Sequence, residues 1–517
     1  MKRDLPFHRL LAPFFFCLIG TLWLASSALA AEFNLMVAPQ TLRSDEVTLL
    51  WDKPELALKG AEFELFCDGR IVATTTKTHY TMKGLAPESA HAFAVRLKGE
   101  PQKAAITPGD SVRITTPAKE TVVSIEKFGA VGDGKTLNTK AIQAAIDACP
   151  LNGVVEIPRG VFLSGALYLK SDMTLHVAAG GVLKGSTLPA DYAPMIRNRF
   201  EGWELETYAS LINAGSIDRS DFPKIRHVSI RGEGKISGGG NTLAQAIIAT
   251  HGLRGRGRLI CFMNASDVEI QGLTLEEPQC WTLHYIYSEN VTCHDLTINS
   301  NVRNGDGIDP DSSRNSYIVN CTFSTGDDCI AVKSGKNPEG NVVNRPTENV
   351  RITDCRFDRG HGISIGSEIS GGIRGVRVED CVAGKLLYGM QIKATKDRGA
   401  FVEDVTVRDC DLQMITILTD LPYNNDGQPA PEQPYFRNFH FSHIDLTKAD
   451  ATRPVIVING FPAAGHRTSH VTLSDLRLPA GARIQVDQAE DVTFTAITMT
   501  DNSAPKYEVT RSDRVSF

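Results

Sequence analysis

The segment "VRITDCRF" (350–357) is one copy of a pattern that recurs between residues 268 and 499. Val350 and Ile352 flank a polar residue, and after Asp354 the alternation shifts phase so that Cys355 and Phe357 continue it. Alternate side chains of a strand point to the same face. Two short strands joined by a tight bend at Asp354 would therefore keep all four apolar side chains inside. The segment predicts a strand–bend–strand unit with one buried interior.

Eight further copies carry the same pattern: "VEIQGLTL" (268–275), "VTCHDLTI" (291–298), "YIVNCTF" (317–323), "VRVEDCVA" (376–383), "VTVRDCDL" (405–412), "FHFSHIDL" (439–446), "VTLSDLRL" (471–478) and "VTFTAITM" (492–499). Corresponding positions in successive copies are 21 to 34 residues apart, which is typical of a solenoid. Seven of the nine copies place Gly, Asn or Asp at the bend, and these residue types tolerate left-handed backbone geometry. The predicted fold class is all-β, dominated by a right-handed parallel β-helix.

Four cysteines occupy the same repeat position as Leu and Ile in other copies: Cys321, Cys355, Cys381 and Cys410. A free cysteine behaves as a small buried hydrophobe, so we expect these four to be free rather than bridged. The spacing leaves six others undecided: Cys67, Cys149, Cys261, Cys280, Cys293 and Cys329.

Residues 1–30 are predicted to be an export signal. Lys2 and Arg3 precede an apolar run over 10–24, and Ala28-Leu29-Ala30 supplies an A-x-A cleavage site. The alternative is a membrane anchor, for which the run is short. We expect a soluble mature chain, periplasmic or secreted, that does not associate with a membrane.

Residues 32–118 are predicted to form a separate β-sandwich. Short β-rich segments at 47–51, 61–69, 70–76 and 90–99 alternate with turn residues. Trp51 and "LAPESAHAFAV" (85–95) resemble a fibronectin type III domain, although His91 stands where that family usually has its corner tyrosine. Residues 122–517 are assigned to the β-helix, beginning with a helix capped at Asn138 that would cover the open end of the solenoid.

The overall charge excludes a general nucleic-acid binder. The formal net charge is -6 and the sequence pI about 6.1, so no basic excess would drive counterion release from a polyanion. A polyanionic ligand must instead be met by local Lys and Arg side chains. We expect a monomer.

Three successive coils place a polar residue two positions before an isoleucine: Asp306 before Ile308, Asp328 before Ile330, and His361 before Ile363. If the isoleucines stack, the polar groups stack as well, about 4.8 Å apart per coil. We expect each strand to begin just after them, which would leave them at its edge. Asp327 lies beside Asp328 in "TGDDCIAVKSG" (325–335).

Crowded carboxylates raise some pKa values and keep other groups ionised, and glycosidic cleavage needs one protonated acid and one ionised base. In an inverting enzyme, these two groups are about 6.5–9.5 Å apart to admit water. Two alternatives remain open on spacing alone: aspartates that cap bends, and a calcium site.

Four ordered motifs resemble those of glycoside hydrolase family 28, the polygalacturonases: "NGDGIDPDSS" (304–313), "GDDCIAVKSG" (326–335), "GHGISIGSE" (360–368) and "QIK" (391–393). The resemblance implies hydrolysis of α-1,4-galacturonosyl bonds in pectin with inversion, with no metal and no cofactor. It implies that Asp327 is the general acid and that Asp306 and Asp328 activate the water. His361 would tune the acid, and Lys393 would bind a substrate carboxylate.

The chain departs from the family pattern at Gln391, where an arginine is usual, and Arg398 or Arg374 could compensate because a guanidinium suits carboxylate recognition. The first motif reads Asn304-Gly305-Asp306, which retains the acid. Further candidates for substrate contact are Tyr423, His284 and Asn304. For His284, a core position is an equal alternative.

Polygalacturonases with an N-terminal fibronectin type III domain resemble exo-acting bacterial members, and the segment 197–222 could close the cleft. We therefore expect release of mono- or digalacturonate from pectin. Alternatives within the family are an endo-polygalacturonase and a rhamnogalacturonan or xylogalacturonan hydrolase. Outside it, a calcium-dependent pectate lyase or a non-catalytic pectin-binding β-helix would share the fold.

Overall fold

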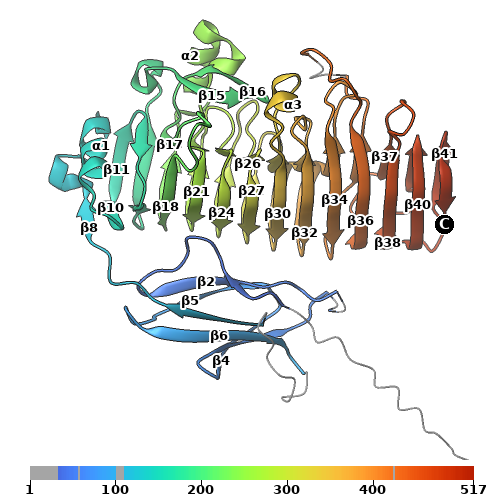
Figure 1. Ribbon diagram of the computed structural model, residues 1–517, viewed down its shortest axis with the longest axis horizontal. Coiled ribbons are helices and arrows are strands. Elements are labelled where there is room, and N and C mark those ends of the chain that lie inside the picture. The colour runs from blue at the N-terminus through green and yellow to red at the C-terminus, as the bar shows by residue number, and fades with distance from the viewer. Residues whose placement is uncertain (1–32, 56, 58, 100–109, 423–425) are drawn as a thin grey trace, which may run out of the picture.

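The computed structural model describes residues 33–517 apart from 56, 58, 100–109 and 423–425. Parallel strands stack into a long solenoid, and a small β module lies beneath its strands (Figure 1). The predicted all-β class, a right-handed parallel β-helix preceded by a small β domain, is confirmed. The predicted export signal lies outside the described residues. Within the described part of the chain, no helix is long and apolar enough to span a bilayer.

The largest face of the solenoid is a parallel sheet of 14 strands. Its strands are β8 (Val122–Ser124), β10 (Gly153–Ile157), β13 (Met173–Val177), β18 (Ile225–Gly232), β21 (Ala265–Gln271), β24 (Glu289–His294), β27 (Arg314–Val319), β30 (Thr347–Thr353), β32 (Ile373–Glu379), β34 (Phe401–Arg408), β36 (Tyr435–Asp445), β38 (Thr468–Leu478), β40 (Ala489–Met499) and β42 (Asp513–Ser516).

Two further rows of parallel strands complete each coil and merge through two long strands, β31 (Arg356–Ile365) and β33 (Val382–Lys393). The first row contains β9 (Asp133–Leu137), β11 (Gly160–Ser164), β14 (Gly181–Gly185), β19 (Lys235–Ser237), β22 (Thr274–Glu276), β25 (Thr297–Asn299) and β28 (Thr322–Ser324). The second contains β12 (Leu167–Leu169), β17 (Ile212–Gly215), β20 (Ile260–Met263), β23 (Leu283–Ile286), β26 (Ile308–Asp311), β29 (Ile330–Val332), β35 (Ile415–Leu418), β37 (Ile456–Asn459), β39 (Arg483–Asp487) and β41 (Lys506–Thr510).

The bend predicted from the repeat is present in every copy. The backbone angle φ is 55° at Asp354 and lies between 52° and 75° at the corresponding residue of the other eight copies. This includes His443 at 52° and Ala496 at 54°; alanine, unlike histidine, gives no local signal for left-handed geometry. The stacking of the coils imposes the bend at these two positions.

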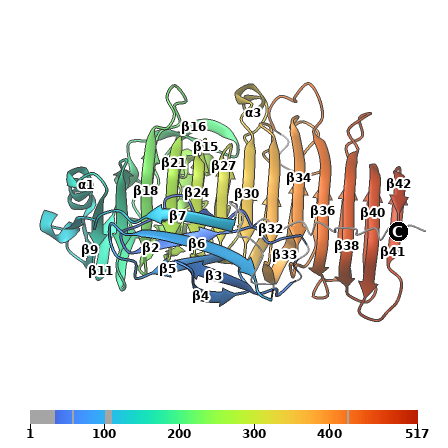
Figure 2. The same cartoon turned by 60° about the horizontal axis from the view of Figure 1, so that its bottom comes forward.

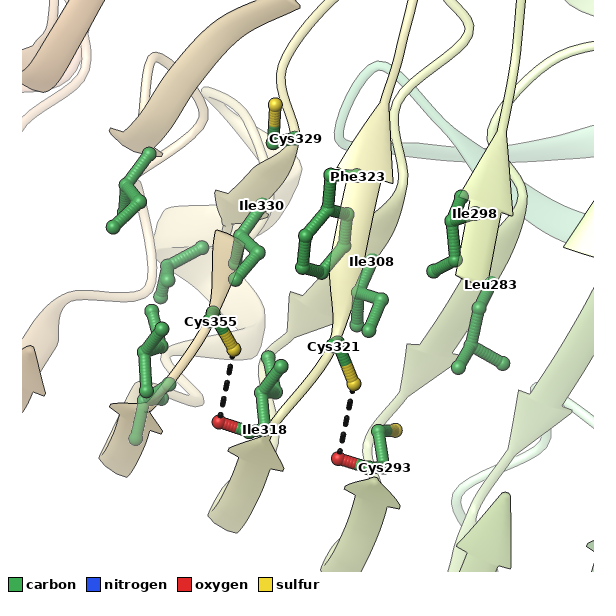
Figure 3. Packing of buried hydrophobic residues seen from close by; sticks show 14 of the residues in the cluster. Leu283, Cys293, Ile298, Ile308, Ile318, Cys321, Phe323, Cys329, Ile330 and Cys355 are labelled. Carbon is green, nitrogen blue, oxygen red and sulfur yellow. Dashed lines mark hydrogen bonds between the residues drawn. The ribbon is translucent and has the colours of Figure 1, made fainter. Parts of the chain in front are cut away.

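The column of residues after the bend is buried, as predicted, except that Ile497 is only partly buried. Cys321 and Cys355 point inward, and their thiols lie 3.6 Å from the carbonyl oxygens of Cys293 and Ile318 (Figure 3). All ten cysteines of the described residues are free and buried. The prediction of free thiols is therefore confirmed, and the six undecided cysteines are also unbridged.

Helix α1 (Thr139–Ala148) covers the N-terminal end of the solenoid, as predicted, and buries Ile142 and Ile146. Asn138 occupies the N-cap position, but its side-chain oxygen accepts the N–H of Val131 rather than a helix N–H. The other helices among the described residues are α2 (Gly240–His251), α3 (Glu339–Val343), η2 (Ile125–Phe128), η3 (Pro189–Tyr192) and η4 (Leu253–Gly255). An antiparallel hairpin of β15 (Ile196–Phe200) and β16 (Trp203–Thr207) projects from the solenoid.

The N-terminal module consists of two antiparallel sheets around buried Trp51 and Phe63. One sheet contains β1 (Met36–Val37), β2 (Glu46–Leu50) and β5 (His79–Lys83). The other contains β4 (Arg70–Thr75), β3 (Phe63–Cys67), β6 (Ala90–Leu97) and β7 (Ser111–Thr115). The four segments predicted as strands coincide with β2, β3, β4 and β6.

The module docks on the 14-stranded sheet, away from hairpin β15–β16 (Figures 1 and 2). Leu50 packs with Val319 of β27. Lys53, buried, places Nζ 2.9 Å from Asp380 Oδ1 and 2.6 Å from Asp409 Oδ2. Asp380 and Asp409 are the bend residues of two successive repeats, so the module contacts the repeating bends of the solenoid directly.

Candidate active site

Strand register stacks the three isoleucines predicted to align. Ile308 pairs with Ile330, and Ile330 pairs with Ile363. Strands β26 and β29 begin at these residues, so Asp306 and Asp328 precede their strands, as expected. The expectation is wrong for His361, which lies inside the long strand β31. A register shift between Gly360 and Gly362 marks an irregularity there.

The three polar groups line one open cavity of 570 Å³ together with Asp327, Asn304 and Lys393. The cavity lies on the outward side of the row that contains β26 and β29. Asp306 and Asp328 are 3% exposed, whereas the side chains of Asp327 and His361 are 28% exposed. Asp327 is therefore the carboxylate of this group that is most accessible to an incoming molecule.

Asp328 is held as a carboxylate. Its Oδ1 accepts the hydroxyl of Ser364 at 2.7 Å, and Lys393 Nζ lies 3.1 Å from its Oδ2. Burial would raise the pKa of Asp328, but Lys393, His361 and Lys333 outweigh burial and hold that pKa well below its usual range. Asp328 can therefore accept a proton at neutral or mildly acidic pH only from a strong donor or from water that is reacting.

His361 bridges the two adjacent aspartates. Its Nδ1 lies 3.1 Å from Asp327 Oδ1 and 3.4 Å from Asp328 Oδ1. Burial would lower the pKa of His361, but the two carboxylates outweigh it and raise that pKa to about 10. The positive charge of the imidazolium therefore offsets the repulsion between the Asp327 and Asp328 carboxylates. The ring of Tyr388 packs edge-on against the His361 ring. Asp327 and Asp328 can therefore be adjacent in the chain without both being exposed to solvent.

A second buried cation, Lys333, lies close to three further carboxylates, those of Asp306, Asp309 and Glu368. Its Nζ lies 3.3 Å from Asp306 Oδ2, 3.4 Å from Asp309 Oδ1 and 3.8 Å from Glu368 Oε2, and 4.5 Å from the ring centre of Trp281. Burial and the neighbouring Asp309 raise the pKa of Asp306 well above its ordinary value despite Lys333. Asp306 and Asp328 thus differ in proton affinity although they line the same cavity.

Sequence reasoning missed Lys333 as a site residue. The alternation after Ile330 places Ala331 and Lys333 on the outward face and Val332 inside, and Asp311 pairs with Lys333 across the coils. This alternation of inward and outward side chains was the sequence signal that could have identified Lys333. Asp309, which does not line the cavity, is fully buried, and burial raises its pKa to about 7.

Two predicted substrate contacts are buried instead. His284 is fully buried, with Nε2 3.3 Å from Asp311 Oδ2 and Nδ1 3.4 Å from Arg258 Nε. Burial lowers its pKa to about 4, so it is a neutral core histidine. Arg398 is also fully buried and donates to the Ser367 carbonyl at 2.9 Å, which corrects the expectation that it contacts substrate directly. Hairpin β15–β16 and the loop at residue 337 cover these two side chains. Neither segment belongs to the repeat pattern, so the pattern could not predict that His284 and Arg398 are buried.

Gln391 is 2% exposed and lies beside Ser364, with its Oε1 3.4 Å from that hydroxyl. Ser364 in turn donates to Asp328. Gln391 Oε1 and Asp328 Oδ1 therefore compete for the single proton of the Ser364 hydroxyl, and the shorter distance favours Asp328. Gln391 does not line the cavity. Asn304 does line the cavity, and its Oδ1 accepts a hydrogen bond from Arg256 Nη2 at 2.8 Å. Tyr423 lies outside the described residues. Arg374 is paired with Glu348 on the 14-stranded sheet.

Residues of three separate segments meet in the lining of the cavity. Arg254 of η4 lies 2.7 Å from Glu201, between β15 and β16, and 2.9 Å from Asp426. The guanidinium also lies 4.7 Å from the ring centre of Trp203, and Lys336 approaches that ring at 4.2 Å and pairs with Asp426. The expectation that the region 197–222 contributes a wall agrees with Glu201 and Trp203. No residue of the described part of the N-terminal module lines the cavity.

Asp327, Asp328 and His361 could also be considered for a metal ion, because one ligand atom of each lies within 4.8 Å of the others. Their surroundings are unsuited to one. Lys393 already neutralises Asp328, and the carboxylates keep His361 protonated, whereas metal ligation requires a neutral imidazole.

Comparison with known proteins agrees with this geometry. The sequence model described as "Glycosyl hydrolases family 28" matches residues 156–499. The chain is 26% identical to "Exo-poly-alpha-D-galacturonosidase" of Dickeya chrysanthemi over 94% of this chain and 93% of that protein. It is 36% identical to "Probable polygalacturonase" of Vitis vinifera over 55% of this chain and 59% of that protein. The solved family 28 exopolygalacturonase of Yersinia enterocolitica superposes with a TM-score of 0.85 at 25% identity, covering 94% of this chain and 99% of that one.

Proposed function

We propose, since the chain belongs to glycosyl hydrolases family 28, that it hydrolyses α-1,4-galacturonosyl bonds of polygalacturonate by acid–base catalysis with inversion, acting from a chain end. The observation that carries the proposal is the cavity itself. It combines three carboxylates, Asp306, Asp327 and Asp328, with the buried cations Lys333 and Lys393. Relatives named as polygalacturonases and exo-polygalacturonases support the substrate class.

In this mechanism Asp327 donates the proton to the leaving glycosidic oxygen. It is the most exposed carboxylate of the three, and it forms one hydrogen-bonded pair with His361. The imidazolium stores a proton 3.1 Å from the Asp327 carboxylate. We assign His361 the task of orienting the Asp327 carboxyl group toward the glycosidic oxygen through this contact.

Asp328 removes a proton from the attacking water, and Asp306 positions that water. Lys393 keeps Asp328 ionised, whereas the raised pKa of Asp306 makes it the better carrier of a proton. One oxygen of Asp327 lies within 4.8 Å of one oxygen of Asp328, which is closer than the about 6.5–9.5 Å expected between the acid and the base of an inverting enzyme. The proposal of inversion is therefore supported by membership of the family and not by this distance. No step requires a metal ion or a cofactor.

The substrate is a polyanion, and its carboxylates need cations near the cavity. Arg254, Arg303 and Lys393 line it, and a guanidinium can bind a carboxylate in bidentate geometry. We propose that Glu201 and Arg254, which line the cavity, limit extension of a polymer at one end; this arrangement supports exo action. We propose that the leader over 1–30 exports the enzyme to where pectin is met.

The test is a time course on polygalacturonate in which reducing ends and viscosity are followed together, with EDTA in a parallel sample. We expect reducing ends to rise while viscosity falls slowly, with mono- or digalacturonate as the products and no effect of EDTA. A rapid fall in viscosity with mixed oligomers would refute the exo assignment. Loss of activity in EDTA with formation of an ultraviolet-absorbing unsaturated product would refute hydrolysis in favour of a lyase.

A further inference from the structure

A second cluster of side chains of metal-ligating types lies on the N-terminal module, outside the cavity of the candidate active site. Cys67 ends β3, Asp68 follows in the β3–β4 turn, and His91 lies near the start of β6. Cys67 Sγ is 3.7 Å from Asp68 Oδ2 and 4.0 Å from His91 Nδ1, and these last two atoms are 2.8 Å apart. Strands β3 and β6 pair directly, with Cys67 opposite Phe93, so the sheet register brings the three residues together.

The atoms of the cluster that point away from its centre already have partners. His91 Nε2 lies 2.8 Å from Ser89 Oγ, and Asp68 Oδ1 accepts the N–H of Ala92 at 2.8 Å. The Ser89 hydroxyl donates to the carbonyl of Ala86, so its oxygen is available to accept a proton from Nε2–H of His91. His91 Nδ1 and Asp68 Oδ2 are 2.8 Å apart and share a second proton; when that proton leaves, the lone pair of Nδ1 faces the sulfur and this carboxylate oxygen. Hydrogen bonds of this kind orient the ligands of protein metal sites.

We propose that Cys67, Asp68 and His91 bind a divalent transition-metal ion, of which Zn²⁺ fits best. One thiolate, one imidazole and one carboxylate are all zinc ligands, whereas Ca²⁺ and Mg²⁺ take oxygen ligands. The ion replaces the proton shared by His91 and Asp68, and its two positive charges balance the thiolate and the carboxylate. The Asp68 side chain is 51% exposed, so the ion enters from solvent and a water molecule completes the coordination.

The required movement is small. Zinc bonds of about 2.3 Å to sulfur and about 2.0–2.2 Å to nitrogen and oxygen separate tetrahedral ligand atoms by roughly 3.2–3.6 Å. The distance between His91 Nδ1 and Asp68 Oδ2 must therefore widen from 2.8 Å, and the thiol must approach the ring from 4.0 Å. Asp68 can supply this movement because it lies in an exposed turn. The bound ion would tie that turn to β6.

The experiment uses the full chain after chelation and desalting. We expect one equivalent of Zn²⁺ to bind in equilibrium dialysis, and the same site to take Co²⁺ with a sulfur-to-cobalt charge-transfer band in the near ultraviolet. This band identifies the cluster, because the active-site group of Asp327, Asp328 and His361 contains no sulfur. Binding without the band would place the ion elsewhere and overturn the proposal, as would the absence of binding.

Variants localise the site. Cys67→Ser and His91→Gln are each expected to abolish the band, and Ser89→Ala to weaken Zn²⁺ affinity by about tenfold through loss of the outer hydrogen bond. Cys149→Ser is the matched control, because Cys149 is also buried and free but has no histidine or carboxylate of the cluster beside it. It should keep the band at full intensity. Circular dichroism of each variant verifies folding, and a folded Cys67→Ser variant that keeps the band would refute the assignment.

Discussion

Replacement of Lys393 by methionine removes the cation that keeps Asp328 ionised while preserving the length of the side chain. The two charges are 3.1 Å apart and both residues are buried, so their attraction is about 5 kcal/mol at an effective dielectric constant of about 20. His361 and Lys333 remain, and water will enter, so only part of this energy is lost from the carboxylate form. We expect at least about 1.4 kcal/mol to be lost, which corresponds to about one pH unit.

The pKa of Asp328 should therefore rise in Lys393→Met, and the acid limb of the pH profile should move to higher pH. This limb is measured as kcat/KM for release of reducing ends from an oligogalacturonate. Lys385→Met, an exposed position on the same strand β33, is the control and should leave the limb in place. An unmoved acid limb with a change in KM alone would refute the reasoning, because Lys393 would then act only on the substrate.

Three further outcomes follow from the packing. Lys53→Met removes the buried cation shared by the partly buried Asp380 and the buried Asp409, so urea unfolding should show a loss of about 3–5 kcal/mol; the exposed Lys98→Met on the same module should leave the midpoint unchanged, and equal midpoints for both variants would contradict the docking. A reductant should not shift the unfolding midpoint, since the ten described cysteines are free; a lower midpoint in reductant would reveal a bridge. Because burial raises the pKa of Asp309 to about 7, its contribution to stability is complete below its unfolded pKa of about 3.9 and is lost as pH rises through about 7; urea midpoints of Asp309→Asn should fall less over this interval than those of the parent, and parallel curves would speak against it.

The repeat pattern predicted the fold because each coil buries the same positions. The alternation in "VRITDCRF" specifies which side chains point inward, and Asp354 marks the bend. Stacking then aligned Ile308, Ile330 and Ile363, and with them the aspartates of the site. These are local patterns, so they were readable without a structure.

The covering loops were not predictable in the same way. His284 and Arg398 have outward or polar sequence positions, but hairpin β15–β16 and the residues around Asn337 bury them. Burial by segments distant in sequence leaves no periodic signal. The same reason explains why the contacts among Glu201, Trp203 and Arg254 could not be predicted from the sequence, although the length of 197–222 had indicated an extra loop.

The measurement that tests the central claim most directly is proton NMR of the first product released from a short α-1,4-oligogalacturonate, by the parent enzyme and by Asp327→Asn. The account predicts that the parent releases galacturonate with the β anomeric configuration before mutarotation, and that Asp327→Asn, which lacks the acid, loses at least about 10²-fold in rate. An α anomer, an unsaturated product, or an Asp327→Asn variant with full activity would contradict inverting hydrolysis by these aspartates.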